Sequence, residues 1–191
     1  MIEIRWHGRG GQGAKTAALL FGDILLGTGK YVQAFPEYGP ERMGAPVQAF
    51  NRISDEPIRL HCGITEPDFV VVLDDSLADK TPVASGLKAT GKILINTTKT
   101  SQQLAQQLNL PTARVITIDA SRIALETIGR PIPNTPMLGV LIGVVGNIPI
   151  ESAIKELTKK LELKFRNKPE VIEGNIAAVK MAYQMIIGGN K

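Results

Sequence analysis

The chain opens with Ile2-Glu3-Ile4-Arg5-Trp6-His7-Gly8-Arg9-Gly10-Gly11-Gln12-Gly13, and a run of helix formers follows from Ala14 to Leu26. Residues 2–7 alternate between apolar and polar side chains, which is typical of a β-strand. The later run predicts a helix that ends at Gly27-Thr28-Gly29, and Tyr31 to Phe35 predicts a second strand. Strand, turn, helix and strand form a βαβ unit, for which we expect parallel strands and a right-handed crossover.

Further strands are predicted downstream. Val47 to Ile53 alternates, turn formers occupy residues 54–56, and Pro57 to Leu60 follows, so we expect an inserted antiparallel β-hairpin. Phe69 to Leu73 is continuously apolar, as is typical of a strand buried on both faces. Lys92 to Asn96 and Arg114 to Ile118 predict two more strands.

Most of the remaining chain predicts helices. They are expected at Ser101 to Leu108, Ala120 to Ile128, Met137 to Val145, Ile150 to Leu161 and Pro169 to Ile187. No linker, internal repeat or low-complexity tract interrupts the chain. The sequence therefore predicts an α/β fold: a three-layer, Rossmann-like, mostly parallel sheet with an inserted β-hairpin and a helical C-terminus, formed by residues 1–191 as a single domain.

Composition argues against several classes of protein. The net charge of +4 favours anionic ligands or acidic partners, but the basic residues are scattered and only 5% of residues are aromatic, so no nucleic-acid-binding surface is predicted. No apolar stretch reaches the ~20 residues that span a bilayer. The first residues resemble a strand and not a signal peptide. We therefore expect a cytoplasmic protein that does not bind membranes.

Cysteine and histidine are scarce. Cys62 is the only cysteine, which excludes an internal disulfide and a cysteine-held iron–sulfur or zinc site within this chain. We expect Cys62 to be buried, because free cysteine behaves as a small hydrophobic residue. His7 and His61 are the only histidines, and neither has supporting ligands nearby in sequence. No metal site and no catalytic residue are predicted.

The glycine cluster contains G-x-G-x-x-G at Gly8, Gly10 and Gly13, between a strand and a helix. Glycine permits a tight turn and lets a ligand approach the backbone, and the start of the helix offers unpaired N–H groups to an anion. The alternative is a tight strand-to-helix turn that packs closely and binds nothing.

Two nucleotide-binding motifs fit poorly. A dinucleotide site requires an acidic residue at the end of the second strand, and Tyr31 to Phe35 contains none. A P-loop requires Lys directly after the last glycine, but Ala14 precedes Lys15-Thr16, which rotates Lys15 by about 100° around the helix. Asp74, after the apolar strand, imitates the acidic residue that holds magnesium in such enzymes.

Two segments resemble the signature motifs of the 2-oxoacid:ferredoxin oxidoreductase gamma family. They are residues 7–14, His-Gly-Arg-Gly-Gly-Gln-Gly-Ala, and residues 37–47, Glu-Tyr-Gly-Pro-Glu-Arg-Met-Gly-Ala-Pro-Val. The resemblance continues through residues 96–99 and 134–139 to the C-terminal helix and covers essentially the whole chain. The combination of motifs is much more specific than the glycines alone.

This resemblance implies a gamma subunit of a pyruvate:ferredoxin oxidoreductase, which makes acetyl-CoA, CO₂ and reduced ferredoxin from pyruvate and coenzyme A. It implies alpha, beta and delta partner subunits that carry thiamine diphosphate, Mg²⁺ and the iron–sulfur clusters, while this chain binds no cofactor alone. Enzymes for 2-oxoisovalerate, 2-oxoglutarate or indolepyruvate remain alternatives, as do a stand-alone Rossmann-type nucleotide-binding protein and a pure scaffold.

The resemblance also suggests residues that handle coenzyme A. We expect the backbone of the glycine cluster to contact phosphate, nearby cations to add charge, and two amides to donate hydrogen bonds to the pantetheine or near the thiamine site. The residues are Gly8, Arg9, Gly10, Gly11, Gln12, Gly13, Arg42, Lys99 and Asn134. Arg42 could instead pair with Glu37 or Glu41, and Lys99 and Asn134 could simply cap loops.

Overall fold

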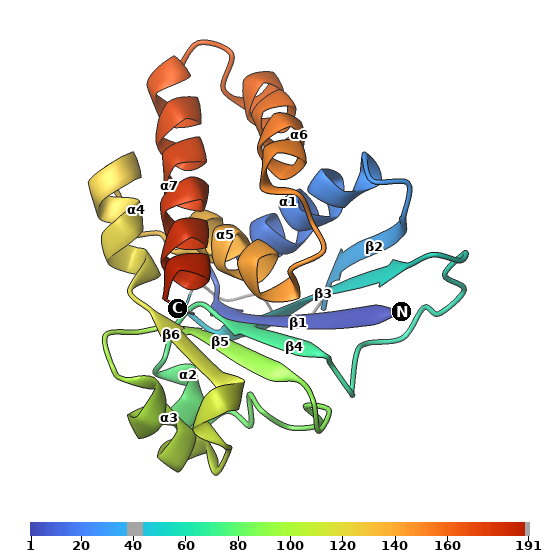
Figure 1. Ribbon diagram of the computed structural model, residues 1–191, viewed down its shortest axis with the longest axis vertical. Coiled ribbons are helices and arrows are strands. Elements are labelled where there is room, and N and C mark those ends of the chain that lie inside the picture. Colours follow the sequence, from blue (N-terminus) through green and yellow to red (C-terminus); the bar gives the residue numbers. More distant parts are fainter. Residues whose placement is uncertain (38–43, 190–191) are drawn as a thin grey trace.

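A computed structural model describes residues 1–37 and 44–189, and it contains a six-stranded sheet between two layers of helices (Figure 1). The strand order is β2-β3-β1-β4-β5-β6. The strands are β1 (Ile2–Arg9), β2 (Tyr31–Pro36), β3 (Pro46–Ser54), β4 (Phe69–Val72), β5 (Lys92–Asn96) and β6 (Val115–Ile118). The helices are α1 (Ala14–Leu26), α2 (Leu77–Lys80), α3 (Ser101–Leu108), α4 (Ala120–Ile128), α5 (Asn134–Val145), α6 (Ile150–Lys164) and α7 (Pro169–Gly188).

The predicted three-layer α/β fold is confirmed. Helices α1 and α4 to α7 cover one face of the sheet, and the short helices α2 and α3 cover part of the other (Figure 1). Successive residues of a strand point to opposite faces, so Val71 and Leu94 join the core under the large layer while Val70 and Ile93 join the core under the small one. Burial on both faces explains the continuously apolar strands.

The predicted hairpin is wrong in its pairing. Residues 57–60 form no strand, and β3 instead pairs antiparallel with β1 on one side and β2 on the other. Ala49 lies opposite Trp6, and Phe50 lies opposite Phe35. Strand β1 pairs with β3 at eight positions and β2 pairs with it at six, more than the four residues 57–60 could provide, so these pairings form more cross-strand contacts.

The opening βαβ unit is confirmed in direction but is not contiguous. Strands β1 and β2 both run antiparallel to β3, so they run parallel to each other with β3 between them. In a dinucleotide-binding fold the second strand lies next to the first, which places its terminal acid at the ribose. The intervening strand therefore separates this fold from that class, in addition to the missing acid.

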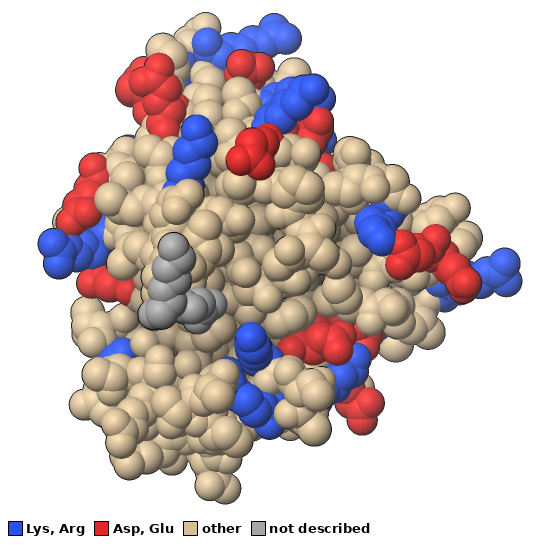
Figure 2. Space-filling view, in the orientation of Figure 1, with Lys and Arg blue, Asp and Glu red and all other residues tan. Residues whose placement is uncertain are grey.

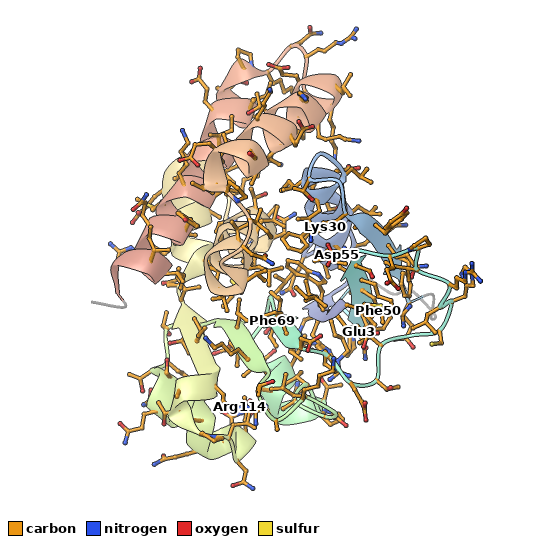
Figure 3. All side chains as sticks on the ribbon, turned by 45° about the vertical axis from the view of Figure 1, so that its right-hand side comes forward. Glu3, Lys30, Phe50, Asp55, Phe69 and Arg114 are labelled. Carbon is orange, nitrogen blue, oxygen red and sulfur yellow. The ribbon has the colours of Figure 1, made fainter. Side chains whose placement is uncertain are left out.

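Strand β1 has one apolar and one charged face. Ile4 and Trp6 are fully buried in the core that includes α1. The opposite face carries Glu3, whose Oε1 accepts a hydrogen bond of 2.9 Å from Nε of Arg52 in β3. Figure 3 labels Glu3 and, near it, Phe50 of the same strand β3. Arg52 is only 1% exposed and also donates to the backbone carbonyl of Cys62 at 2.8 Å.

Cys62 itself is exposed, so the prediction that it is buried is wrong. Arg52 binds the backbone carbonyl of Cys62, and the residue stays at the surface.

Candidate functional site

The glycine cluster forms the connection between β1 and α1, at the carboxyl end of the parallel strands. We call residues 8–13 the glycine loop. Ligands of open α/β sheets bind in the crevice outside this end of the strands. Two recesses flank the loop there, and Gly11 lines both of them. The location is therefore the one at which this fold class places a ligand.

Two of the four glycines serve close packing. A Cβ atom on Gly8 would lie 3.1 Å from Cβ of Ala14, so its absence lets the start of α1 approach β1. Gly13 has φ +83°, and a Cβ there would lie 2.6 Å from Nδ2 of Asn134. Gly13 thus lets the first residue of α5 pack against the loop, and the fold brings Asn134 to the glycine loop.

The other two glycines differ in what surrounds them. Gly10 forms a pair of backbone hydrogen bonds with the segment before β3: its N–H donates to Ala45 at 2.9 Å, and its carbonyl accepts from Gly44 at 3.1 Å. Its N–H is therefore already engaged. Gly11 has φ +95° and is exposed, and a Cβ there would have no atom of the described residues within 4 Å. Gly11 forms the open crest of the loop.

Asp74 binds the side chains of Arg9 and Gln12, which are partly buried. Nε of Arg9 and Nε2 of Gln12 donate to Oδ2 of Asp74 at 3.0 and 2.8 Å. Nη1 of Arg9 donates to the Gly44 carbonyl at 3.1 Å, and Nη2 donates to Oγ of Ser76 at 2.7 Å. The sequence interpretation assigned these side chains to the ligand, but the structure gives each of them protein partners.

The first recess lies at the start of α1 and has a volume of about 440 Å³. The N–H groups of Gly11, Gly13, Ala14 and Thr16 have no hydrogen-bond partner within residues 1–37 and 44–189. Lys15 and Thr16 also line the recess, so the extra residue relative to a P-loop does not remove Lys15 from it. Glu37 also lines this recess. We call this cavity the α1 recess.

The second recess, of about 290 Å³, lies on the other side of the loop, between the ends of β4 and β5. Its polar walls come from Gln12, Asp74, Asp75, Asn96 and Ser121. Asn96 bridges the strands, because its Nδ2 donates to the Leu73 carbonyl and to Oγ of Ser121, both at 2.9 Å. Burial raises the pKa of the Asp74 carboxyl, but hydrogen bonds from Ser76 and Gln12 and the charge of Arg9 outweigh burial, so the pKa lies below its ordinary value.

The remaining predicted residues divide into two cases. Lys99 does not line either recess: its Nζ lies 3.9 Å from Oδ2 of Asp75, which also accepts from Oγ1 of Thr97 at 2.6 Å. Arg42 lies outside the described residues. Sequence reasoning missed Ser76 and named Asp74 only as an imitation of a magnesium-holding acid, although its place directly after a buried strand was a signal for the site.

His7 lies under the loop and cannot act as an acid or base near neutral pH. It is 5% exposed, and its Nε2 accepts a hydrogen bond of 3.0 Å from Nε of Arg5. Burial and the charge of Arg5 lower the pKa of His7 from 6.5 to about 3. His7 is therefore a neutral acceptor in the folded chain.

This pKa predicts a pH dependence of stability. Between pH 6.5 and about 3 the unfolded chain binds a proton at His7 that the folded chain does not, so stability is lost as the pH falls through this window. We expect the wild type to lose about 1.4 kcal/mol per pH unit from this residue. Urea unfolding at pH 7, 6 and 5 should show a smaller loss in His7→Gln, whereas the control His61→Gln, at an exposed position, should match the wild type. Equal slopes in wild type and His7→Gln would contradict this assignment.

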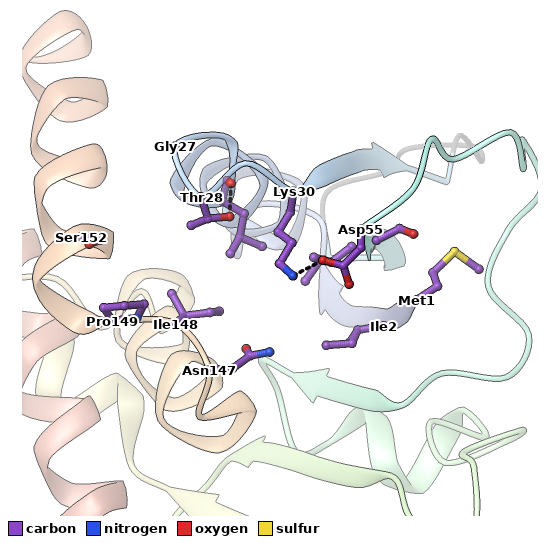
Figure 4. A pocket seen from close by; sticks show the side chains of 13 residues that line it. Met1, Ile2, Gly27, Thr28, Lys30, Asp55, Asn147, Ile148, Pro149 and Ser152 are labelled. Carbon is purple, nitrogen blue, oxygen red and sulfur yellow. Dashed lines mark hydrogen bonds and ion pairs between the residues drawn. The ribbon is translucent and has the colours of Figure 1, made fainter.

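A further cavity of about 390 Å³ lies at the opposite, amino end of β1. Ile2, Leu25 and Ile148 form apolar walls, and an ion pair between Lys30 and Asp55 lies across it (Figure 4). None of the candidate coenzyme A residues in the described part of the chain lines this cavity.

Surface charge is mixed. Figure 2 shows basic and acidic side chains interspersed on the visible face, without a large field of one sign. Among the described residues, no helix is both long and apolar enough to cross a bilayer.

Comparison with known proteins identifies the family. The family model described as pyruvate ferredoxin/flavodoxin oxidoreductase matches residues 3–185. The chain belongs to this oxidoreductase family. The resemblance inferred from the two sequence motifs is thereby confirmed, and the chain is a gamma-type subunit of a 2-oxoacid:ferredoxin oxidoreductase.

Individual relatives cover nearly the same length. The chain is 45% identical to pyruvate synthase subunit PorC of Thermotoga maritima, over 97% of this chain and 94% of that protein. It is 52% identical to the pyruvate/ketoisovalerate oxidoreductases common subunit gamma of Thermococcus litoralis, over 82% of this chain and 86% of that protein. The crystal structure of pyruvate oxidoreductase subunit PORC from Thermotoga maritima matches with a TM-score of 0.83 at 43% identity, covering 96% of this chain and 95% of that one.

Proposed function

We propose that this oxidoreductase subunit serves an enzyme that oxidatively decarboxylates pyruvate with coenzyme A to acetyl-CoA, CO₂ and reduced ferredoxin. Support comes from relatives of nearly equal length that are named as pyruvate synthase subunits. In this proposal residues 1–191 act as one domain in the cytoplasm, assembled with alpha, beta and delta subunits.

The cofactors belong to those partners. One cysteine cannot ligate an iron–sulfur cluster, which requires about four such ligands. Among the described residues, no three His, Cys, Asp or Glu side chains converge as metal ligands. Thiamine diphosphate, Mg²⁺ and the clusters would therefore be held by the other subunits and supply decarboxylation and electron transfer there.

Another 2-oxoacid is the second candidate substrate. The relative at 52% identity is named as a subunit common to pyruvate and ketoisovalerate oxidoreductases. A subunit shared by two enzymes does not choose between their substrates. We therefore assign the choice of 2-oxoacid to the partner subunits.

Within this enzyme, we assign to the chain a share in binding coenzyme A. The observation that carries the assignment is the α1 recess, where N–H groups of Gly11, Gly13 and Ala14, which have no partner in the described part of the chain, meet the positive end of the α1 dipole. Coenzyme A carries a pyrophosphate, and such a group is stabilised by N–H donors at the start of a helix. Lys15 lines the same recess and adds a cation.

In this proposal the residues of the glycine loop divide into those that contact phosphate and those that support the loop. Gly11 and Gly13 remain phosphate contacts through their N–H groups, whereas Gly8 and Gly10 build the loop. Arg9 and Gln12 become residues that hold the loop in place, since their polar atoms bind Asp74 and the backbone. Asn134 lies against Gly13 and stays a candidate amide contact.

Replacing Gly11 with Ala tests the assignment. A Cβ on Gly11 meets no atom of residues 1–37 and 44–189 within 4 Å, but Gly11 lines both recesses, so the added methyl group would obstruct the ligand. We expect the KM for coenzyme A to rise about tenfold in the assembled enzyme, as loss of roughly 1.4 kcal/mol of binding implies. Viologen reduction at varied coenzyme A measures it.

Gly29→Ala is the matched control. Gly29 also has positive φ (+74°) and open space for a Cβ, but it lies beyond the far end of α1. Both variants carry a similar backbone strain, of about 1–2 kcal/mol. An unchanged KM for coenzyme A in a normally assembled Gly11→Ala enzyme would refute the phosphate assignment.

A further inference from the structure

Asp74 follows β4 and Leu73, where P-loop ATPases place the acidic residue that holds magnesium. Here its carboxylate is engaged by protein donors on both oxygens. Oδ1 accepts from the N–H and the Oγ of Ser76 at 3.0 and 2.5 Å. Oδ2 accepts from Gln12 and Arg9 of the glycine loop. The Asp74 side chain is 19% exposed, so these bonds form in a partly desolvated place.

The two loop contacts are connected to each other. Oε1 of Gln12 accepts from the backbone N–H of Arg9 at 2.7 Å, and the backbone N–H of Gln12 donates to the Arg9 carbonyl at 3.0 Å. The Gln12 side chain thus stabilises the turn over residues 9–12 by a hydrogen bond within the loop. Its Nε2 also donates to Asp74, which lies outside the loop.

Arg9 extends the same connection to the segment before β3. Its Nη1 donates to the carbonyl of Gly44, whose N–H in turn donates to Gly10. The Asp74 carboxylate therefore binds Arg9 and Gln12, the two residues on either side of Gly10 and Gly11. No other acidic side chain among the described residues forms an ion pair or side-chain hydrogen bond with the glycine loop.

We propose that Asp74 is a positioning residue for coenzyme A, which holds the glycine loop through Gln12 and Arg9 in the shape that presents its N–H groups to phosphate. This role rests on the proposed function of the α1 recess. Asp74 does not line that recess and so acts only through the loop. A loop fixed before binding loses less conformational freedom when the ligand arrives, so affinity depends on the residue that fixes it.

The experiment is Asp74→Asn in the assembled four-subunit enzyme. An amide at this position turns its NH₂ either toward Gln12 and Arg9, which removes the contacts with the loop, or toward Ser76, which leaves the loop held by a neutral oxygen without the ion pair to Arg9. We expect the KM for coenzyme A to rise about tenfold, with kcat at saturating coenzyme A and the KM for pyruvate within about twofold of wild type.

Asp68→Asn is the control. Asp68 directly precedes β4 at the opposite end of the strand, accepts from the Glu3 N–H at 2.8 Å and pairs with Lys88 at 2.9 Å. The same chemical change there removes comparable contacts without touching the glycine loop. Its KM for coenzyme A should equal that of the wild type.

The double variant Gln12→Glu/Asp74→Asn provides a rescue. It reverses the hydrogen bond, because the amide introduced at position 74 can donate to one oxygen of the carboxylate introduced at position 12. The other oxygen of that carboxylate still accepts from the backbone N–H of Arg9, and the net charge is kept. We expect the KM for coenzyme A to return toward the wild-type value. Failure of this rescue would count against the proposal.

Other outcomes separate the two assignments. If Gly11→Ala raises the KM for coenzyme A and Asp74→Asn does not, the positioning role is overturned and the phosphate site stands. If neither variant raises it, the phosphate site itself is overturned. Should Asp74→Asn not assemble, the single variant Gln12→Glu places a second carboxylate against that of Asp74 and removes the hydrogen bond between them. An unchanged KM for coenzyme A in Gln12→Glu would equally overturn the proposal.

Discussion

Pyruvate- and coenzyme A-dependent viologen reduction is expected to fall to background when the partner subunits are assembled without this chain. The expectation follows from the position of the α1 recess, because the N–H groups that we assign to the coenzyme A phosphates lie on this chain. The measurement compares the initial rate of the complex with and without the chain at saturating pyruvate and coenzyme A.

Adding back purified chain serves as the control for damage to the partners. Wild-type chain should restore the rate, and Gly11→Ala chain should restore it only at raised coenzyme A concentrations. Full activity of the partners alone would contradict the assignment of this chain as a functional subunit, and the stand-alone nucleotide-binding alternative would then need testing with ATP and NAD(P).

The second large effect concerns stability, at the crossing of α5 and α7. Gly139 of α5 lies against the backbone of α7, and a Cβ there would be 2.2 Å from the carbonyl oxygen of Val179 and 3.1 Å from the N of Tyr183. Gly139→Ala must therefore push two helices apart, since backbone cannot rotate away as a side chain can. We expect a loss of about 3 kcal/mol, the upper part of the range for overpacked cores.

Urea unfolding followed by far-UV circular dichroism measures this loss. Gly143→Ala, one turn later, meets side-chain atoms of Ile186 and Tyr183, the nearest at 3.2 Å, and should cost less. Gly188→Ala at the end of α7 meets no atom of the described residues within 4 Å and should be neutral or slightly stabilising, because Ala favours helix. Equal midpoints for the Gly139 and Gly188 variants would show that the helices have room to separate.

The helices were predictable because their signals are local. The bounds expected for α1, α3 and α4 are those observed, and each helix ends at a residue suited to stopping it, such as Gly27, Asn109 or Gly129. The pairing of β3 was not predictable in this way. Residues 57–60 are near in sequence, but strand partners are selected by the total surface that a pairing buries, and β1 and β2 offer more of it.

The site was predictable in place but not in detail. A glycine pattern between a strand and a helix located the loop and its open crest. It could not show that the Gly10 N–H is occupied by Ala45, or that Asp74 binds Arg9 and Gln12, because these partners lie 35 and 62 or more positions away along the chain. The type of a side chain indicates which groups it can bind, but only the folded structure shows which of those groups lies next to it.

The insertion of β3 between β1 and β2 also has a consequence for synthesis on the ribosome. When residues 1–36 have emerged, β1, α1 and β2 are present, but the strand that joins β1 to β2 is not. The sheet cannot form on that side until residue 54 is available, so the nascent chain carries two unpaired strands in the interval. Unpaired strand edges promote aggregation, and a translational pause before β3 would lengthen that exposure.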